Sequence, residues 1–344
     1  MSQTVPAAPT PEASRELITR FKSRLKSGGE ALRTAYEAHP LTEPILKGRS
    51  RLVDGVLVDI WKEFGIPASA SLVAVGGYGR EELFPFSDVD LLFLLDREPD
   101  HDLSERLTQM IGLLWDVGLD IGHSVRTIDE CIEEAGLDVT VMTNLLEARL
   151  IGGNTRLFDR FTEQLRSALN VGQFFKAKRL EQEQRYTRHN ETPYSLEPNC
   201  KESPGGLRDL QIIGWISRAA GFGTHWRDLA SHGLVTAKEA TELRDLERFL
   251  QHARIRLHHI AGRREDRLLF DHQEKLAHRF GFEANEHRRA SEVFMQEYYR
   301  TAKKVTQLNT ILLQNIGAAL APERQERFRS RTDPRFPPCR CWQS

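Results

Sequence analysis

Two short apolar segments separated by a glycine-rich turn constrain the fold more than any other part of this sequence. Residues 72–75 and 89–95 are runs of aliphatic and aromatic residues, a pattern typical of strands buried in a sheet. Gly-Gly-Tyr-Gly follows the first run at residues 76–79, and a short polar segment leads into the second. The stretch therefore predicts a strand, a tight turn, a brief helix and a second strand.

Residues suited to phosphate and metal chemistry stand where this turn meets the strands. Glycines directly after a strand let backbone N–H groups approach an anion closely. Asp88 and Asp90 open the second strand, and alternation along a strand puts both carboxylates on one side and Val89 on the other. A few carboxylates together with substrate phosphates are the ligands that Mg²⁺ prefers. The pattern thus predicts a metal-dependent nucleotidyl-transfer site with Asp88 and Asp90 as metal ligands.

Each half of this pattern has an ordinary structural explanation when it occurs alone. A glycine turn is often simple loop geometry, and an Asp-x-Asp is often a solvated strand end. The conjunction is more specific, because unpaired acids beside an apolar strand carry a desolvation cost. Arg80 either neutralises phosphate charge, the role we favour, or forms a salt bridge with Glu81 or Glu82.

A third carboxylate is expected for two-metal phosphoryl transfer. An amphipathic helix over residues 103–117 is followed by a predicted strand over 121–127, and Thr127 is suited to cap the next helix. This third strand carries His123 and Ser124 where an acid would be convenient. Asp120 is the candidate for the missing acid, because Asp116 is expected on the exposed side of its helix.

The remainder of the chain reads as mostly helical, so the sequence predicts an α+β protein with a small mixed sheet followed by a helical bundle. The predicted domains are a disordered tail (1–13), a sheet-bearing domain with N-terminal helices (14–137), a helical bundle (138–320) and an unstructured tail (321–344). Further helices are predicted over 14–39 with a break at Gly28-Gly29, 48–64, 139–150, 155–189, 237–261 and 285–316.

A polar, proline-containing loop over residues 190–204 leads into a second motif, Lys-Glu-Ser-Pro-Gly-Gly-Leu-Arg-Asp-Leu-Gln at 201–211. The glycines precede an apolar helix whose N-terminal N–H groups suit an anion, with Lys201 and Arg208 adding charge. Gly-Gly before a helix is also ordinary capping, and Arg208 with Asp209 is equally explained as a buried pair locking two helices together.

Composition limits the partners and the compartment. The chain has 344 residues and a formal net charge of −1, so it lacks the basic excess of a duplex or tRNA binder. The four cysteines lack zinc-site spacing and indicate a reducing compartment. No segment is apolar enough to be a signal peptide or a membrane span. We expect a cytoplasmic protein without nucleic-acid or membrane partners.

Residues 72–96 resemble the nucleotidyltransferase signature of the DNA polymerase beta superfamily, in the form found in bacterial protein-PII uridylyltransferases (the uridylyl-removing enzyme family). Residues 201–211 resemble the same family and are similar to the related glutamine synthetase adenylyltransferases. The resemblance extends over about residues 15–325, which is the transferase part alone. The phosphohydrolase and ligand-sensing domains of the whole family enzymes are expected to be absent.

This resemblance implies Mg²⁺-dependent transfer of UMP from UTP to a tyrosine of the PII nitrogen-signalling protein, with release of pyrophosphate. Glutamine synthetase adenylyltransferase and a non-catalytic helical binding module remain alternatives, and a tRNA-end nucleotidyltransferase fits the neutral charge less well. The predicted catalytic residues are Asp88, Asp90 and Asp120. The predicted nucleotide-binding residues are Gly76, Gly77, Gly79, Arg80, Ser87, Lys201 and Arg208.

Overall fold

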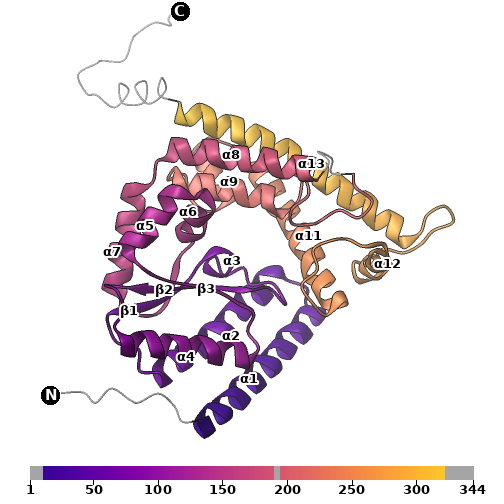
Figure 1. Ribbon diagram of the computed structural model, residues 1–344. Coiled ribbons are helices and arrows are strands. Elements are labelled where there is room, and N and C mark those ends of the chain that lie inside the picture. Colours follow the sequence, from indigo (N-terminus) through magenta and orange to yellow (C-terminus); the bar gives the residue numbers. More distant parts are fainter. Residues whose placement is uncertain (1–10, 190–193, 322–344) are drawn as a thin grey trace, which may run out of the picture. The chain divides into compact units, whose positions relative to one another are not determined.

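The computed structural model describes residues 11–189 and 194–321 (Figure 1). These residues divide into two compact units. The sheet-bearing unit contains residues 11–169, 194–201 and 248–298, and the helical unit contains residues 170–189, 202–247 and 299–321. The predicted tails lie outside the described residues, apart from 11–13 and 321; helix α1 already begins at Pro11.

A four-stranded mixed sheet with the strand order β3-β2-β1-β4 organises the sheet-bearing unit. Strand β2 is antiparallel to β1 and parallel to β3, while β4 is antiparallel to β1. These strands are β1 (Ala70–Ala74), β2 (Val89–Leu95), β3 (Ile121–Thr127) and β4 (Arg149–Gly153). The predicted α+β class with a small mixed sheet is confirmed.

Strand β4 corrects the predicted helix over residues 139–150. Helix α6 (Val139–Leu146) ends earlier, and the chain then pairs with β1. Gly153, the second of the two glycines that suggested a helix stop, instead allows a close approach of two backbones. A Cβ atom on Gly153, whose φ is +96°, would lie 2.5 Å from the carbonyl oxygen of Ala70.

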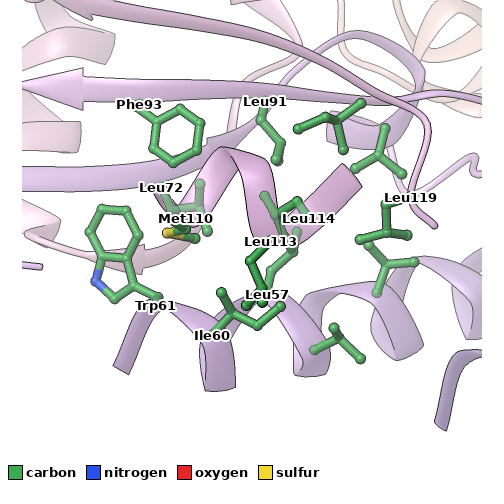
Figure 2. Close-up of a cluster of buried hydrophobic side chains, with 14 of the residues drawn as sticks. Leu57, Ile60, Trp61, Leu72, Leu91, Phe93, Met110, Leu113, Leu114 and Leu119 are labelled. Carbon is green, nitrogen blue, oxygen red and sulfur yellow. The ribbon is translucent and has the colours of Figure 1, made fainter. Parts of the chain in front are cut away.

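One face of the sheet packs against three helices, α1 (Pro11–Ala38), α2 (Thr42–Glu63) and α4 (His101–Val117). Figure 2 shows side chains of α2, β1, β2 and α4 meeting in this core. Trp61 of α2 stacks on Phe93 of β2 with 6.4 Å between ring centroids. The odd-numbered residues of β2 point into this core, so Asp90 points to the opposite face.

Helix α1 is continuous through Gly28-Gly29, where a break was predicted. The reason is packing between helices. A Cβ atom on Gly28 would lie 2.7 Å from the methyl groups of Leu52 on α2. The Leu52 side chain thus occupies the space beside Gly28, so this glycine lies at a contact between α1 and α2 rather than at a helix end.

The opposite side of the unit carries α5 (Ile128–Leu137), α6 and α7 (Thr155–Ala168), and α7 packs against β1, β2 and β4. Thr127 caps α5 in a capping box with Glu130, as its position predicted. The single helix predicted over 155–189 is wrong: it is α7 and α8 (Val171–Arg188). The side chain of Asn170 caps the start of α8 by accepting from the Gln173 N–H.

The other described helices are α3 (Gly76–Gly79), α9 (Leu207–Ala219), α10 (Trp226–Ser231), α11 (Ala237–Ala261), α12 (Phe270–Arg279) and α13 (Ala290–Leu320). Helices α11 and α13 each contribute residues to both units. In the described part of the chain, no helix has the length and apolarity needed to cross a membrane.

Candidate active site

Strand β2 begins next to the glycine turn that follows β1. The N–H of Val75 donates to the carbonyl oxygen of Asp90 at 3.1 Å, and the N–H of Val89 donates to that of Asp120 at 2.8 Å. These bonds hold the end of β1 and the approach to β3 on either side of the Asp88-Val89-Asp90 segment. Val89 is buried in the core, as the strand alternation predicted.

The Asp90 carboxylate lies between two glycines. A Cβ atom built on Gly76 would be 3.4 Å from Asp90 Oδ2, and one built on Gly122 of β3 would be 2.6 Å from Asp90 Oδ1. Gly76 also has a φ of +57°, a conformation that favours glycine. The turn and β3 thus both leave room for this carboxylate, and the acid faces the glycine bend.

The electrostatics of Asp90 fit a site for a cation. Burial and the neighbouring charge of Asp88 raise the pKa of Asp90 from 3.8 to about 6, and Asp120 acts in the same direction. Lys201 and Arg264 act in the opposite direction. Clustered acids that repel one another would be stabilised by a divalent cation, so the residues present fit a metal such as Mg²⁺.

Asp120 precedes β3 with an exposed side chain, and its charge acts on Asp90. Asp116 is exposed on α4, as expected. Within the described ranges, no group of three or more His, Cys, Asp or Glu side chains is arranged to hold a metal ion. The site therefore offers Asp88 and Asp90 as a carboxylate pair, and Asp120 stays a prediction as the third acid.

Arg264 is a site residue that the sequence reasoning missed. Its Nη1 lies 3.0 Å from Asp88 Oδ2, although the two residues are 176 positions apart. Arg264 belongs to the connection between α11 and α12. Its nearest sequence signal is the crowding of arginines over residues 252–267, which by itself indicates only a local basic patch.

Lys201 reaches the site from the loop that precedes the second motif. The N–H of Cys200 donates to the Asp266 carbonyl oxygen at 2.8 Å, and Asn199 forms a β-bridge with Arg267. These bonds fix the backbone on which Lys201 stands, and its charge lowers the pKa of Asp90. The described part of the predicted loop is thus anchored to the segment that carries Arg264.

The segment before Asp88 is supported by helix α11. The imidazole of His258 is fully buried between the Pro85 carbonyl oxygen and the Asp266 carboxylate. The guanidinium of Arg254 lies 4.2 Å from the centroid of the Phe84 ring and 2.7 Å from Asp266 Oδ1. Ser87 lies in the turn that follows, where its N–H donates to the Phe84 carbonyl oxygen at 3.1 Å.

Arg80 and Gly79 have clear structural contacts. The Arg80 guanidinium is paired with Glu82 at 3.0 Å and with the buried Glu147; although burial opposes its charge, these acids raise the pKa of Arg80. The Gly79 N–H donates to the Val75 carbonyl oxygen at 3.0 Å. A phosphate cradle at this turn would therefore rest first on Gly76 and Gly77, and the phosphate role of Arg80 stays a prediction.

Arg208 and Asp209 belong to the helical unit, and they are not paired with each other. Arg208 pairs with Glu202 at 2.8 Å. Asp209 is fully buried and pairs with Arg185 of α8, while its Oδ2 accepts from the Gly205 N–H at 2.7 Å. The helix-locking alternative is thus realised by Asp209 with α8, and a nucleotide contact by Arg208 stays a prediction.

Comparison with known proteins agrees with the geometry. Residues 56–147 match the model of the nucleotidyltransferase domain, a class that generally uses a divalent metal. Residues 173–313 match the model of the GlnD PII-uridylyltransferase family.

Curated relatives extend the match along nearly the whole chain. The bifunctional uridylyltransferase/uridylyl-removing enzyme of Aromatoleum aromaticum is 58% identical over 318 residues, which cover 92% of this chain and 37% of the relative. The enzyme of the same name from Nitrosospira multiformis is 51% identical over 91% of this chain and 37% of its own length. The chain thus spans little more than a third of these relatives. Residues 56–147 therefore form a nucleotidyltransferase domain and residues 173–313 belong to the GlnD PII-uridylyltransferase family.

Proposed function

We propose that this chain transfers UMP from UTP to a tyrosine hydroxyl of the PII nitrogen-signalling protein, releasing pyrophosphate in a Mg²⁺-dependent reaction. The observation that carries the proposal is the Asp90 carboxylate, which faces the glycine turn with Asp88 beside it. The uridylyltransferase names of the matched family and relatives support UTP as donor and PII as acceptor.

In the proposed reaction the tyrosine oxygen forms a bond to the α-phosphorus of UTP, and the bond from that phosphorus to the pyrophosphate oxygen breaks. Mg²⁺ held by Asp88 and Asp90 would supply charge neutralisation for the triphosphate. We assign to Asp120 the orientation of the tyrosine hydroxyl and the acceptance of its proton.

The nucleotide contacts in this proposal follow from what each side chain or amide already does. Gly76 and Gly77 would bring backbone N–H groups to the phosphates, and Ser87 and Lys201 would add polar and cationic contacts. Gly79, Arg80 and Arg208 rank behind Gly76 and Gly77, because the Gly79 N–H donates to the Val75 carbonyl oxygen and the two guanidinium groups are paired with acids.

The test is intact-mass spectrometry of PII after incubation with this chain, Mg²⁺ and UTP. We expect PII to gain one uridylyl group per modified tyrosine, and we expect Asp90→Asn to abolish the gain. Asp116→Asn is the matched control, because it makes the same chemical change at an exposed acid on α4. Transfer at the wild-type rate by Asp90→Asn would refute the metal assignment.

Two further results would redirect the proposal. A preference for ATP over UTP, with glutamine synthetase as the better acceptor, would indicate an adenylyltransferase. Tight binding of PII without transfer from either nucleotide would indicate a non-catalytic binding module.

A further inference from the structure

Arg264 forms an ion pair with an acid that the proposed reaction needs for its metal. The Arg264 Nη1 to Asp88 Oδ2 distance is 3.0 Å, and the two side chains are 45% and 42% exposed. A pair this exposed is weak, worth about two- to fivefold in an equilibrium constant. Arg264 can therefore leave Asp88 at little cost.

The backbone beside Arg264 is held independently of that pair. Two residues further on, the Asp266 carboxylate is paired with Arg254 at 2.7 Å and with His258 at 3.2 Å. Its carbonyl oxygen accepts the Cys200 N–H at 2.8 Å. The anchored backbone lets the Arg264 side chain change partners without a change in the surrounding fold.

We propose that Arg264 exchanges partners during the nucleotide cycle: it neutralises Asp88 in the nucleotide-free protein and donates to phosphate oxygens once a metal-bound nucleoside triphosphate enters. A planar guanidinium fork suits a phosphate as well as a carboxylate. A divalent cation and a guanidinium compete for the negative charge of the same carboxylate, whereas a triphosphate attracts both. The inference rests on the proposed function for its ligand class, a nucleoside triphosphate.

Two opposite effects distinguish this exchange from a purely structural ion pair. Loss of the Arg264 charge should tighten the binding of a metal ion alone, because a competitor for Asp88 is removed. The same loss should weaken the binding of UTP in the presence of metal, because a phosphate donor is removed. A structural pair predicts no selective loss of UTP affinity.

The experiment uses two isothermal titrations in the absence of PII. The first measures the binding of Mn²⁺ alone, and the second measures the binding of UTP at saturating Mn²⁺. For Arg264→Gln we expect Mn²⁺ affinity to rise about two- to fivefold and UTP affinity to fall about 10- to 100-fold. Arg264→Lys, which keeps the charge but loses the fork, should lose less UTP affinity than Arg264→Gln.

Arg263→Gln is the matched control, since Arg263 is the preceding residue, 67% exposed, and paired with Glu265 instead of Asp88. It should change both affinities less than about twofold, as expected for a surface charge. Thermal unfolding of each variant checks that the fold is intact. Unchanged or weaker Mn²⁺ binding by Arg264→Gln, or a loss of UTP affinity no larger than that of Arg263→Gln, would overturn the exchange.

These outcomes are separate from the fate of the proposed function. If the opposite effects are observed but PII gains no uridylyl group, the exchange stands and the assigned transfer fails. If PII is uridylylated but the opposite effects are missing, the transfer stands and the exchange is overturned.

Discussion

A methyl group added at Gly79 should destabilise this protein far more than one added at Gly77, although both glycines belong to the same turn. A Cβ atom on Gly79 would lie 2.0 Å from the Glu147 carbonyl oxygen and 3.0 Å from that of Ala74. The nearest atoms to a Cβ on Gly77 lie 3.7 Å and 3.8 Å away, which is ordinary van der Waals contact.

The magnitude follows from how far the neighbours must move. To accept Gly79→Ala, the backbone at Glu147 must retreat by more than 1 Å from its 2.0 Å separation, and that residue also holds Arg80. Overpacking of this kind costs about 1–3 kcal/mol. Gly77→Ala requires no such movement, so we expect its free energy of unfolding to stay within about 0.5 kcal/mol of wild type.

Urea unfolding and UTP binding, measured on both variants, test this reasoning. Gly79→Ala should lower the unfolding midpoint, whereas Gly77→Ala should keep the midpoint and lose UTP affinity, because its methyl group obstructs the proposed phosphate cradle. Equal stability losses in the two variants would refute the packing argument. Full UTP affinity in Gly77→Ala would remove Gly77 from the cradle.

Three further predictions concern buried charges. Burial and Asp88 raise the pKa of Asp90 from 3.8 to about 6, so the metal-free fold loses stability as the pH rises from 3.8 to about 6, and the loss is complete above that range. Asp90→Asn should therefore gain about 1–2 kcal/mol in urea unfolding with EDTA at pH 8, with no gain below pH 4. Asp209→Ala should lose about 3–5 kcal/mol in the same assay, because it leaves the buried Arg185 charge unpaired, and wild-type stability would contradict this. Burial, Arg256 and Arg248 lower the pKa of His252 to about 4, so stability should fall as pH drops from 6.5 to 4. His252→Gln should recover about 1–2 kcal/mol of that fall, and identical pH profiles would count against it.

Local signals were sufficient for the elements closest to the site. Strands β2 and β3 begin and end at the predicted residues, because each is a β-rich segment bounded by turn or capping residues. Thr127 could be recognised as a cap from its own position, since a capping box depends only on residues three apart. Asp88 and Asp90 are predicted as site residues in the same way, from their spacing on one strand.

Strand β4 shows where local signals fail. Residues 149–153 follow a helical pattern and end in two glycines, which locally cannot be told from a helix stop. They form a strand because they pair with β1, about 80 residues earlier in the chain, and tertiary pairing overrides a weak local preference. The prediction of one helix over 155–189 is wrong for a smaller reason: Asn170, which caps α8, stands within a long charged segment and gives only a short local signal.

The charges around Asp90 explain why the site could be predicted only in part. Its acids, Asp88 and Asp120, lie beside adjacent strands. A short motif marks Asp88, whereas Asp120 is indicated only by its place before a predicted strand. Its cations, Lys201 and Arg264, come from segments that join the sheet-bearing unit only through tertiary contacts. Spacing can reveal the residues that repel one another, but not the distant ones that balance them. In the proposed function the acids would hold the metal, and the cations balance part of their negative charge in the ligand-free protein.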